Sequence, residues 1–130
     1  MTHCFRIRVY YEDTDLAGIV YYANYLKFIE RARTEWVRER GVDQSKLKEG
    51  HGIVFAVRRV EADYLVPARF NDDLVVETRP SSHSGARIVL VQSVLRNGET
   101  LFVAKVTLVA LAEGGRPVRF PAEVRQRLES

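Results

Sequence analysis

Three carboxylates stand close together in one short stretch of the chain: Glu12, Asp13 and Asp15, followed by Gly18. An Asp side chain in such a loop commonly hydrogen-bonds the backbone of its own turn. A carboxylate beside a polarised carbonyl can instead act as a nucleophile or as a general base for water. Both interpretations of Asp15 stay open on these residues alone, whereas Glu12 and Asp13 are assigned solvated or structural roles.

The same stretch does not predict a calcium loop. Asp13 to Gly18 matches the opening of that motif, but Ala17 and Asn24 stand where it requires an acidic or amide ligand and a glutamate. The three histidines fit no metal-ligand spacing. Neither a Gly-x-Ser-x-Gly motif nor a glycine-rich phosphate loop is present. We therefore expect no metal site and no cofactor.

A long amphipathic helix is predicted directly after the acidic loop, from Tyr22 to Arg40. Its apolar positions recur every three or four residues: Leu26, Ile29, Ala32, Trp36 and Val37. The first N–H groups of a helix lack internal partners and carry partial positive charge, so they can polarise a carbonyl. Asp15 lies seven residues before Tyr22, so the loop can fold its carboxylate back beside the helix start.

Strand patterns occupy most of the remaining chain. Alternating apolar residues, turn residues and prolines predict strands at Cys4–Tyr11, Ile53–Val66, Leu74–Arg79, Ala86–Arg96 and Thr100–Ala112. The long strand changes phase near Arg58-Arg59, which indicates a bulge. Pro80 is expected to end the third strand. Asn97-Gly98 predicts a tight hairpin between the last two strands.

The remaining segments are predicted to be irregular. The stretch 42–52 is expected to hold one short helical turn, Ser81–Gly85 a loop, and Ala122–Ser130 a charged tail. The whole order predicts an α+β domain over residues 1–130, with one antiparallel sheet curled around one helix. The last two strands are apolar on both faces. They should therefore be central and covered on both sides, the outer side by a second copy of the chain.

Composition limits the class of protein. The single cysteine, Cys4, excludes an intrachain disulfide and favours a reducing compartment. The longest apolar run, Val106–Ala112, is far shorter than the roughly 20 residues that span a membrane. Residues 1–6 do not resemble a signal peptide, so a cytoplasmic protein is expected. The net charge is only +3, without a basic block, and this does not favour nucleic acid binding.

The residues from Tyr11 to Leu26, followed by Glu30–Glu35, resemble the signature of hotdog-fold acyl-CoA thioesterases. The clade is that of 4-hydroxybenzoyl-CoA thioesterase and the Tol-Pal-associated, YbgC-like thioesterases. Tyr64–Leu74 and Arg116–Pro121 are similar to further blocks of the family. The resemblance implies a hotdog fold, in which a sheet wraps the helix, and a dimer joined edge to edge, often paired into a homotetramer.

The resemblance also implies site residues. It places the catalytic carboxylate at Asp15 and the amide that polarises the thioester carbonyl at Tyr22. YbgC-like members usually carry histidine at the Tyr22 position, where this chain is closer to the hydroxybenzoyl enzyme. The implied reaction is hydrolysis of acyl-CoA to a carboxylic acid and CoA. The alternative is a non-catalytic module, on the same fold, that binds acyl-CoA or an acyl-carrier protein.

Coenzyme A brings phosphates, which basic side chains near the pocket mouth should meet. Arg87, at the start of a central strand, is the first candidate for this role. Arg58, Arg59 and Arg119 are weaker candidates. The alternative for each of them is an exposed arginine that only contacts solvent.

Overall fold

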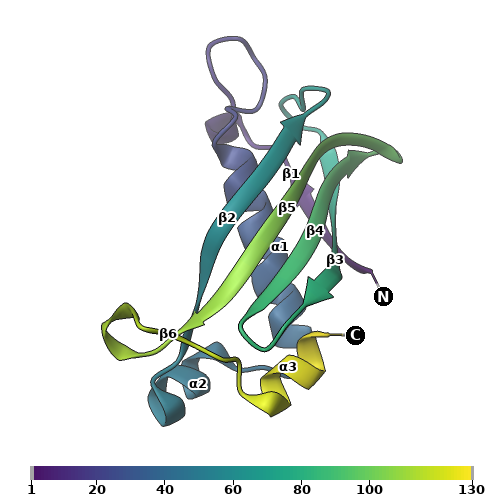
Figure 1. Ribbon diagram of the computed structural model, residues 1–130. Coiled ribbons are helices and arrows are strands. Elements are labelled where there is room, and N and C mark those ends of the chain that lie inside the picture. Colours follow the sequence, from purple (N-terminus) through teal and green to yellow (C-terminus); the bar gives the residue numbers. More distant parts are fainter. Residues whose placement is uncertain (1, 130) are drawn as a thin grey trace.

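The computed structural model describes residues 2–129, and in this part of the chain an antiparallel sheet curves around one long helix (Figure 1). Residues 1 and 130, the ends of the predicted domain, lie outside the described residues. The elements in chain order are β1 (His3–Arg8), α1 (Asn24–Glu39), α2 (Gln44–His51), β2 (Val54–Tyr64), β3 (Asp73–His83), β4 (Arg87–Arg96), β5 (Glu99–Leu111), β6 (Pro117–Val118) and α3 (Ala122–Leu128). Short 3-10 turns cover Tyr11–Asp13 and Glu113–Gly115.

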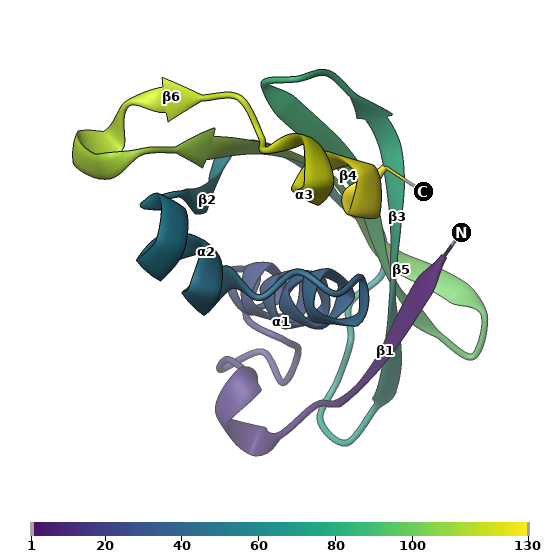
Figure 2. The ribbon, with the colours of Figure 1, turned by 90° about the horizontal axis from the view of Figure 1, so that it is seen from below.

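The strands are ordered β1-β3-β4-β5-β2, with β6 added to the end of β5. All pairings are antiparallel. Seen from below, the sheet bends around α1 (Figure 2). In the view of Figure 1, α2 and α3 lie below the C-terminal end of this helix. This arrangement confirms the predicted α+β class and the hotdog topology, because one helix fills the concave side of one sheet.

The helix α1 begins at Asn24 and ends at Glu39, close to the predicted bounds. Its sheet-facing side is fully buried, and Trp36 and Phe28 are among the largest buried side chains. Leu26 was predicted to belong to the apolar stripe, but it is exposed. The reason is that Leu26 lies on the helix flank that faces the edge of the sheet rather than its centre.

Strand β2 is an edge strand. One side pairs with β5, with a register shift between Val57 and Arg59 that confirms the predicted bulge. The other side has no partner strand within residues 2–129. Its exposed apolar side chains are Val54, Val57, Val60 and Tyr64. Strands β4 and β5 are central as predicted, and their outer faces are only half-buried by the described residues.

The prediction that Pro80 ends a strand is wrong, because β3 continues to His83 and shortens the predicted loop. Pro80 lies opposite Leu90 of β4, just beyond Thr78, where pairing with β1 stops. Proline has no backbone N–H, but at position 80 the side of β3 that faces β1 has no partner strand among the described residues, so no donor is needed there. The hairpin prediction is confirmed: Asn97 and Gly98 have φ values of +51° and +81°.

Two segments predicted to be irregular are helical. In the stretch 42–52, Asp43 accepts a hydrogen bond from the Lys46 N–H at 3.1 Å, and two turns of helix α2 follow. The predicted charged tail forms α3, in which Val124 and Leu128 are buried. These two residues are four apart, so a seven-residue segment has enough apolar surface to dock on the core.

Candidate functional site at the start of the central helix

Asp15 lies in a turn that its own hydrogen bonds close. Its N–H donates to the Ile19 carbonyl at 2.9 Å, its carbonyl accepts from the Gly18 N–H at 3.0 Å, and its Oδ1 accepts from the Ala17 N–H at 2.9 Å. Gly18 has a φ of +79°, which favours glycine. Within residues 2–129, the second carboxylate oxygen of Asp15 has no hydrogen bond. The loop thus fixes the carboxylate through one oxygen and leaves the other available.

The acidic loop is tied to the beginning of α1. The carbonyl of Asp13 accepts two hydrogen bonds at 2.9 Å, one from the Tyr21 N–H and one from Asn24 Nδ2. The Asp13 carboxylate accepts from the Tyr10 N–H at 2.8 Å, which confirms a structural role. Glu12 is exposed. The loop and the helix start therefore form one connected unit.

Tyr22 and Ala23 are the central residues of a turn that leads into α1. The Asn24 N–H donates to the Tyr21 carbonyl at 2.8 Å and closes this turn. Among the described residues, the N–H groups of Tyr22 and Ala23 have no acceptor. They lie next to the positive end of the helix, so they can stabilise negative charge that develops on a carbonyl oxygen.

An apolar cavity of about 270 Å³ opens beside this turn and is lined by Ile19, Val20, Tyr22, Tyr25, Tyr64, Leu65, Val66 and Pro67. The Tyr64 hydroxyl donates to the Tyr22 carbonyl at 3.0 Å, and the two rings meet edge to face. Tyr25 stacks on Phe102, and its hydroxyl accepts from the Ala68 N–H at 3.0 Å. Burial raises the pKa of Tyr25, so its hydroxyl is neutral near pH 7.

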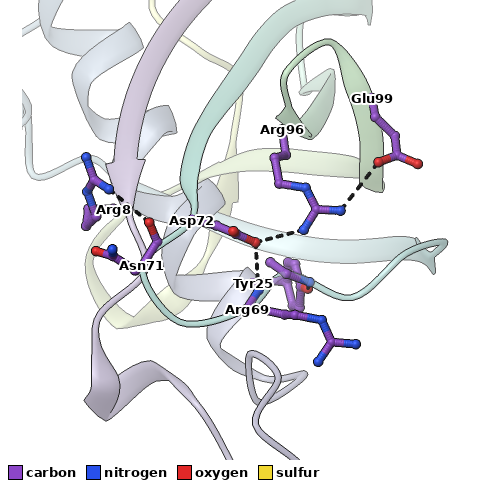
Figure 3. Close-up of polar contacts among 8 residues, drawn as sticks. Arg8, Tyr25, Arg69, Asn71, Asp72, Arg96 and Glu99 are labelled. Carbon is purple, nitrogen blue, oxygen red and sulfur yellow. Dashed lines mark hydrogen bonds and ion pairs between the residues drawn. The ribbon is translucent and has the colours of Figure 1, made fainter.

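The segment 69–72 lies next to the acidic loop and is held in place by the side chains of Arg8 and Arg96 (Figure 3). The Asp72 carboxylate accepts from the Arg69 N–H and from Arg96, both at 2.8 Å. Arg8 donates to the Asn71 carbonyl at 2.9 Å. This segment pairs with the acidic loop through an isolated bridge. The Asp72–Arg96 salt bridge and these hydrogen bonds therefore hold the backbone that pairs with the Asp15 loop.

Three of the four arginine candidates lie together elsewhere in the chain. Arg58, Arg87 and Arg119 line a second cavity of about 660 Å³, whose other walls are mostly apolar. Arg59 does not line this cavity and forms an ion pair with Glu61 at 2.6 Å. A cluster of three cations above an apolar surface can bind phosphate groups next to a flat ring system.

Gly85 allows Arg119 to take up its position in this cluster. The Phe120 N–H donates to the Gly85 carbonyl at 2.9 Å, so the two segments are in direct contact. A Cβ atom at Gly85 would lie 1.9 Å from Nη2 of Arg119. The guanidinium group therefore occupies the space that a side chain at position 85 would fill.

The arginine cluster and the Asp15 loop are separated within one chain. The loop lies near the Tyr64 end of β2, whereas the cluster lies toward the opposite end, near β6 (Figure 1). From Arg58 to Tyr64, the strand covers roughly 20 Å. A single chain thus brings three of the arginines together, but it does not bring them to Asp15.

These features define a hotdog-fold protein with a carboxylate and free backbone amides at the start of its central helix. The family model described as "Thioesterase-like superfamily" matches residues 9–128. The acyl-CoA thioesterase YbgC of Haemophilus influenzae is 46% identical over 93% of this chain and 90% of its own length. The chain therefore belongs to the thioesterase-like superfamily and is similar to its YbgC members.

Solved structures agree with this placement. A probable thioesterase from Bartonella henselae is 39% identical, covers 93% of this chain and 100% of its own, and has a TM-score of 0.89. A 4-hydroxybenzoyl-CoA thioesterase bound to 4-hydroxybenzoyl-CoA has a TM-score of 0.92 over 98% of both chains, at 22% identity. At this low identity, the similarity to the 4-hydroxybenzoyl-CoA thioesterase shows the fold alone. No helix within residues 2–129 has the length and apolarity to cross a membrane.

Sequence reasoning missed the tyrosines that shape the apolar cavity. The sequence pattern places Tyr25 on the apolar face of the helix and Tyr64 near the end of the predicted strand Ile53–Val66. Only the fold brings them to one place, because Tyr64 lies at the far end of a strand that runs antiparallel to α1. The aromatic side chains around the helix start would have been the available signal, but their spacing in the sequence is irregular.

Proposed function

We propose that this protein is an acyl-CoA thioesterase in which Asp15 is the catalytic carboxylate and the Tyr22 N–H polarises the thioester carbonyl. The observation that carries the proposal is the pair of N–H groups at Tyr22 and Ala23, which have no acceptor within residues 2–129 and lie next to the Asp15 loop and an apolar cavity. The cavity accepts the apolar part of the thioester next to its carbonyl. The similarity to YbgC thioesterases supports acyl-CoA as the substrate.

The reaction needs few groups. The carboxylate of Asp15 takes a proton from a water molecule that attacks the thioester carbonyl carbon, or it attacks this carbon itself and forms a mixed anhydride that water then hydrolyses. The backbone amides stabilise the oxyanion while the carbon–sulfur bond breaks. Thiols have a pKa near 8.5, so the thiolate of CoA leaves without a strong general acid. The products are a carboxylic acid and CoA.

We also propose that two chains join through their β2 strands. An edge strand with exposed valines and no partner favours pairing with another strand. A twofold antiparallel pairing about the middle of β2 places Tyr64 opposite the partner's Val54. The arginine cluster of one chain then approaches the Asp15 loop of the other, at a separation that an extended CoA can cover. Arg58, Arg87 and Arg119 would bind its phosphates, with Arg59 outside this set.

The half-buried outer faces of β4 and β5 support a second level of assembly, in which two dimers pack as a homotetramer. Light scattering on the purified protein gives the mass directly. A tetramer has four times the chain mass of 14.9 kDa. A monomer at assay concentration would contradict both the dimer and a site shared between chains. A cytoplasmic location is proposed as well, because the single cysteine, Cys4, fits a reducing compartment, and fractionation of the native host would test it.

The catalytic proposal is tested by thiol release from a panel of acyl-CoAs, with Asp15→Asn and Glu12→Gln compared. Glu12 is an exposed carboxylate of the same loop, so its replacement serves as the matched control. We expect Asp15→Asn to lower kcat by about 100-fold or more, in the range of a lost general base. Wild-type turnover by Asp15→Asn would contradict the role of this residue. Binding of acyl-CoA without any turnover by the wild type would indicate a binding module.

A further inference from the structure

A third cavity lies farther along the flank of α1 that carries Tyr22. Tyr22, Leu26, Glu30, Arg33 and Val37 follow one another along this flank at intervals of three and four residues. The cavity has a volume of about 150 Å³ and lies between α1 and the first half of β2, with Glu30, Arg33, Thr34, Val37, Phe55 and Val57 among its lining residues. Its wall is apolar on the strand side and polar on the helix side.

Arg33 is held in this cavity by a buried amide. Its Nη1 donates to Oε1 of Gln92 at 2.9 Å. Gln92 is fully buried, and its Nε2 donates to the Ile29 carbonyl and to Oγ1 of Thr78, both at 2.9 Å. Both amide hydrogens of Gln92 are therefore in use, which leaves its oxygen facing the arginine. The position of Arg33 is set by a hydrogen-bond chain that reaches into the sheet.

The charge of Arg33 has no counter-ion in direct contact. Within residues 2–129, no carboxylate forms an ion pair with it, and Glu30 instead accepts a hydrogen bond from Thr34. Burial lowers the pKa of Arg33, and the nearby Glu30 raises it by a smaller amount. A guanidinium group carries five N–H donors and no acceptor. Arg33 uses one of its donors on Gln92, so the others can serve a ligand.

We propose that this cavity binds the far end of the acyl group and that Arg33 selects acyl groups carrying an oxygen acceptor there. A half-buried guanidinium with unused donors in an apolar pocket favours a ligand that brings such an oxygen. A volume of about 150 Å³ equals roughly five water molecules at liquid density, which suits a short acyl chain.

The proposal rests on the proposed function and on the β2 pairing. Within one chain, Tyr22 and Arg33 are 11 residues apart, or about 16 Å along the helix. In the antiparallel pairing, the Tyr64 end of one chain lies beside Val54–Val57 of its partner. The helix start that packs on Tyr64 thus comes next to the partner's Arg33 cavity. The thioester carbonyl stays at one helix start while the acyl group enters the other chain.

The test compares three acyl-CoAs with the same five-carbon chain: valeryl-CoA, 5-hydroxyvaleryl-CoA and glutaryl-CoA. These end in a methyl group, a neutral oxygen and a carboxylate. For the wild type we expect kcat/KM to be about tenfold higher or more for at least one of the two oxygen-bearing substrates than for valeryl-CoA. The two oxygen-bearing substrates show whether Arg33 requires charge or only an acceptor.

The variants are Arg33→Met and Arg33→Lys, with Arg31→Met as the matched control because Arg31 is an exposed arginine of the same helix. Arg33→Met should abolish the preference, so that kcat/KM for the oxygen-bearing substrates falls about tenfold relative to kcat/KM for valeryl-CoA. Arg33→Lys should show an intermediate preference. If the methionine variant does not fold, the preference of Arg33→Lys serves as the test. An unchanged preference in the folded variants, or no preference in an active wild type, overturns the inference. An inactive wild type contradicts the proposed function itself.

Discussion

The hydroxyl of Tyr64, the last residue of β2, donates a hydrogen bond to the carbonyl oxygen of Tyr22 at 3.0 Å. This contact joins the edge strand to the turn that lies beside the apolar cavity. Because the N–H groups of Tyr22 and Ala23 have no acceptor among the described residues, the contact helps to fix where they point. The geometry of the proposed oxyanion site thus depends on a side chain more than 40 residues away.

Replacing Tyr64 with phenylalanine tests this dependence. The ring contacts with Tyr22 and Tyr25 are retained, and only the hydroxyl is lost. We expect kcat on the best acyl-CoA to fall by about three- to tenfold, with a stability loss of about 1 kcal/mol in urea unfolding. The control is Tyr11→Phe, because the Tyr11 side chain is 82% exposed. A kcat equal to that of the wild type would show that the turn holds its shape without this bond.

Gly85→Ala tests the arginine cluster. The new methyl group would occupy the place of the Arg119 guanidinium, which is the mobile end of a side chain and would move away. We expect KM for acyl-CoA to rise by about three- to tenfold, because one phosphate contact is lost. The kcat/KM for an acyl-N-acetylcysteamine thioester, which lacks the nucleotide, should not change.

Gly50→Ala is the control for that experiment. Gly50 lies in α2, and no atom is within 4 Å of a Cβ at this position. If Gly85→Ala raises KM equally for both kinds of thioester, its effect does not come from the phosphates. The arginine cluster would then not be the CoA site.

The buried tyrosine beside the cavity predicts a pH dependence of stability. Burial raises the pKa of Tyr25, and the hydrogen bond from the Ala68 N–H lowers it by a smaller amount. The folded state thus favours the neutral hydroxyl. This contribution is fully present below the ordinary tyrosine pKa of about 10 and is lost as the pH rises above it.

The measurement is urea unfolding at about pH 9 and about pH 11, for the wild type and Tyr25→Phe. The variant is expected to be less stable at both values, because the Ala68 N–H loses its acceptor. Its loss of stability between the two values should nevertheless be smaller than that of the wild type. Equal losses would mean that Tyr25 ionises as easily in the folded chain as in the unfolded one.

The sequence predicts the elements that local rules define. The helix bounds, the Asn97-Gly98 hairpin and the bulge at Arg58-Arg59 depend on periodicity and turn chemistry within a few residues. The predictions for Pro80 and for the segment after Ala122 were wrong, because the structure of both depends on residues that are distant in the sequence. Pro80 is tolerated where β1 ends, and α3 forms because the core accepts Val124 and Leu128.

Some residues of the candidate site could be predicted from one local motif, whereas others are brought together only by the fold. Asp15 and Tyr22 come from one continuous motif, so the sequence places them together, and the structure adds the free amides beside them. Arg58, Arg87 and Arg119 come from three separate segments, and only the fold shows that they share a cavity. Arg33 lies in the Glu30–Glu35 part of the family resemblance, but a role for it was not predicted, since its environment is created by Gln92 on strand β4.

The bulge in β2 also affects which strands can pair with the open edge of this strand. A regular apolar edge would accept almost any extended strand, including one from a misfolded chain. Here the register shifts between Val57 and Arg59, and two adjacent arginines stand in the middle of the strand. A flat foreign strand would not match this bend. In the proposed pairing a second copy would bring the same bend in the opposite direction, so the irregularity that weakens this edge as a general template would favour pairing with another copy of the chain.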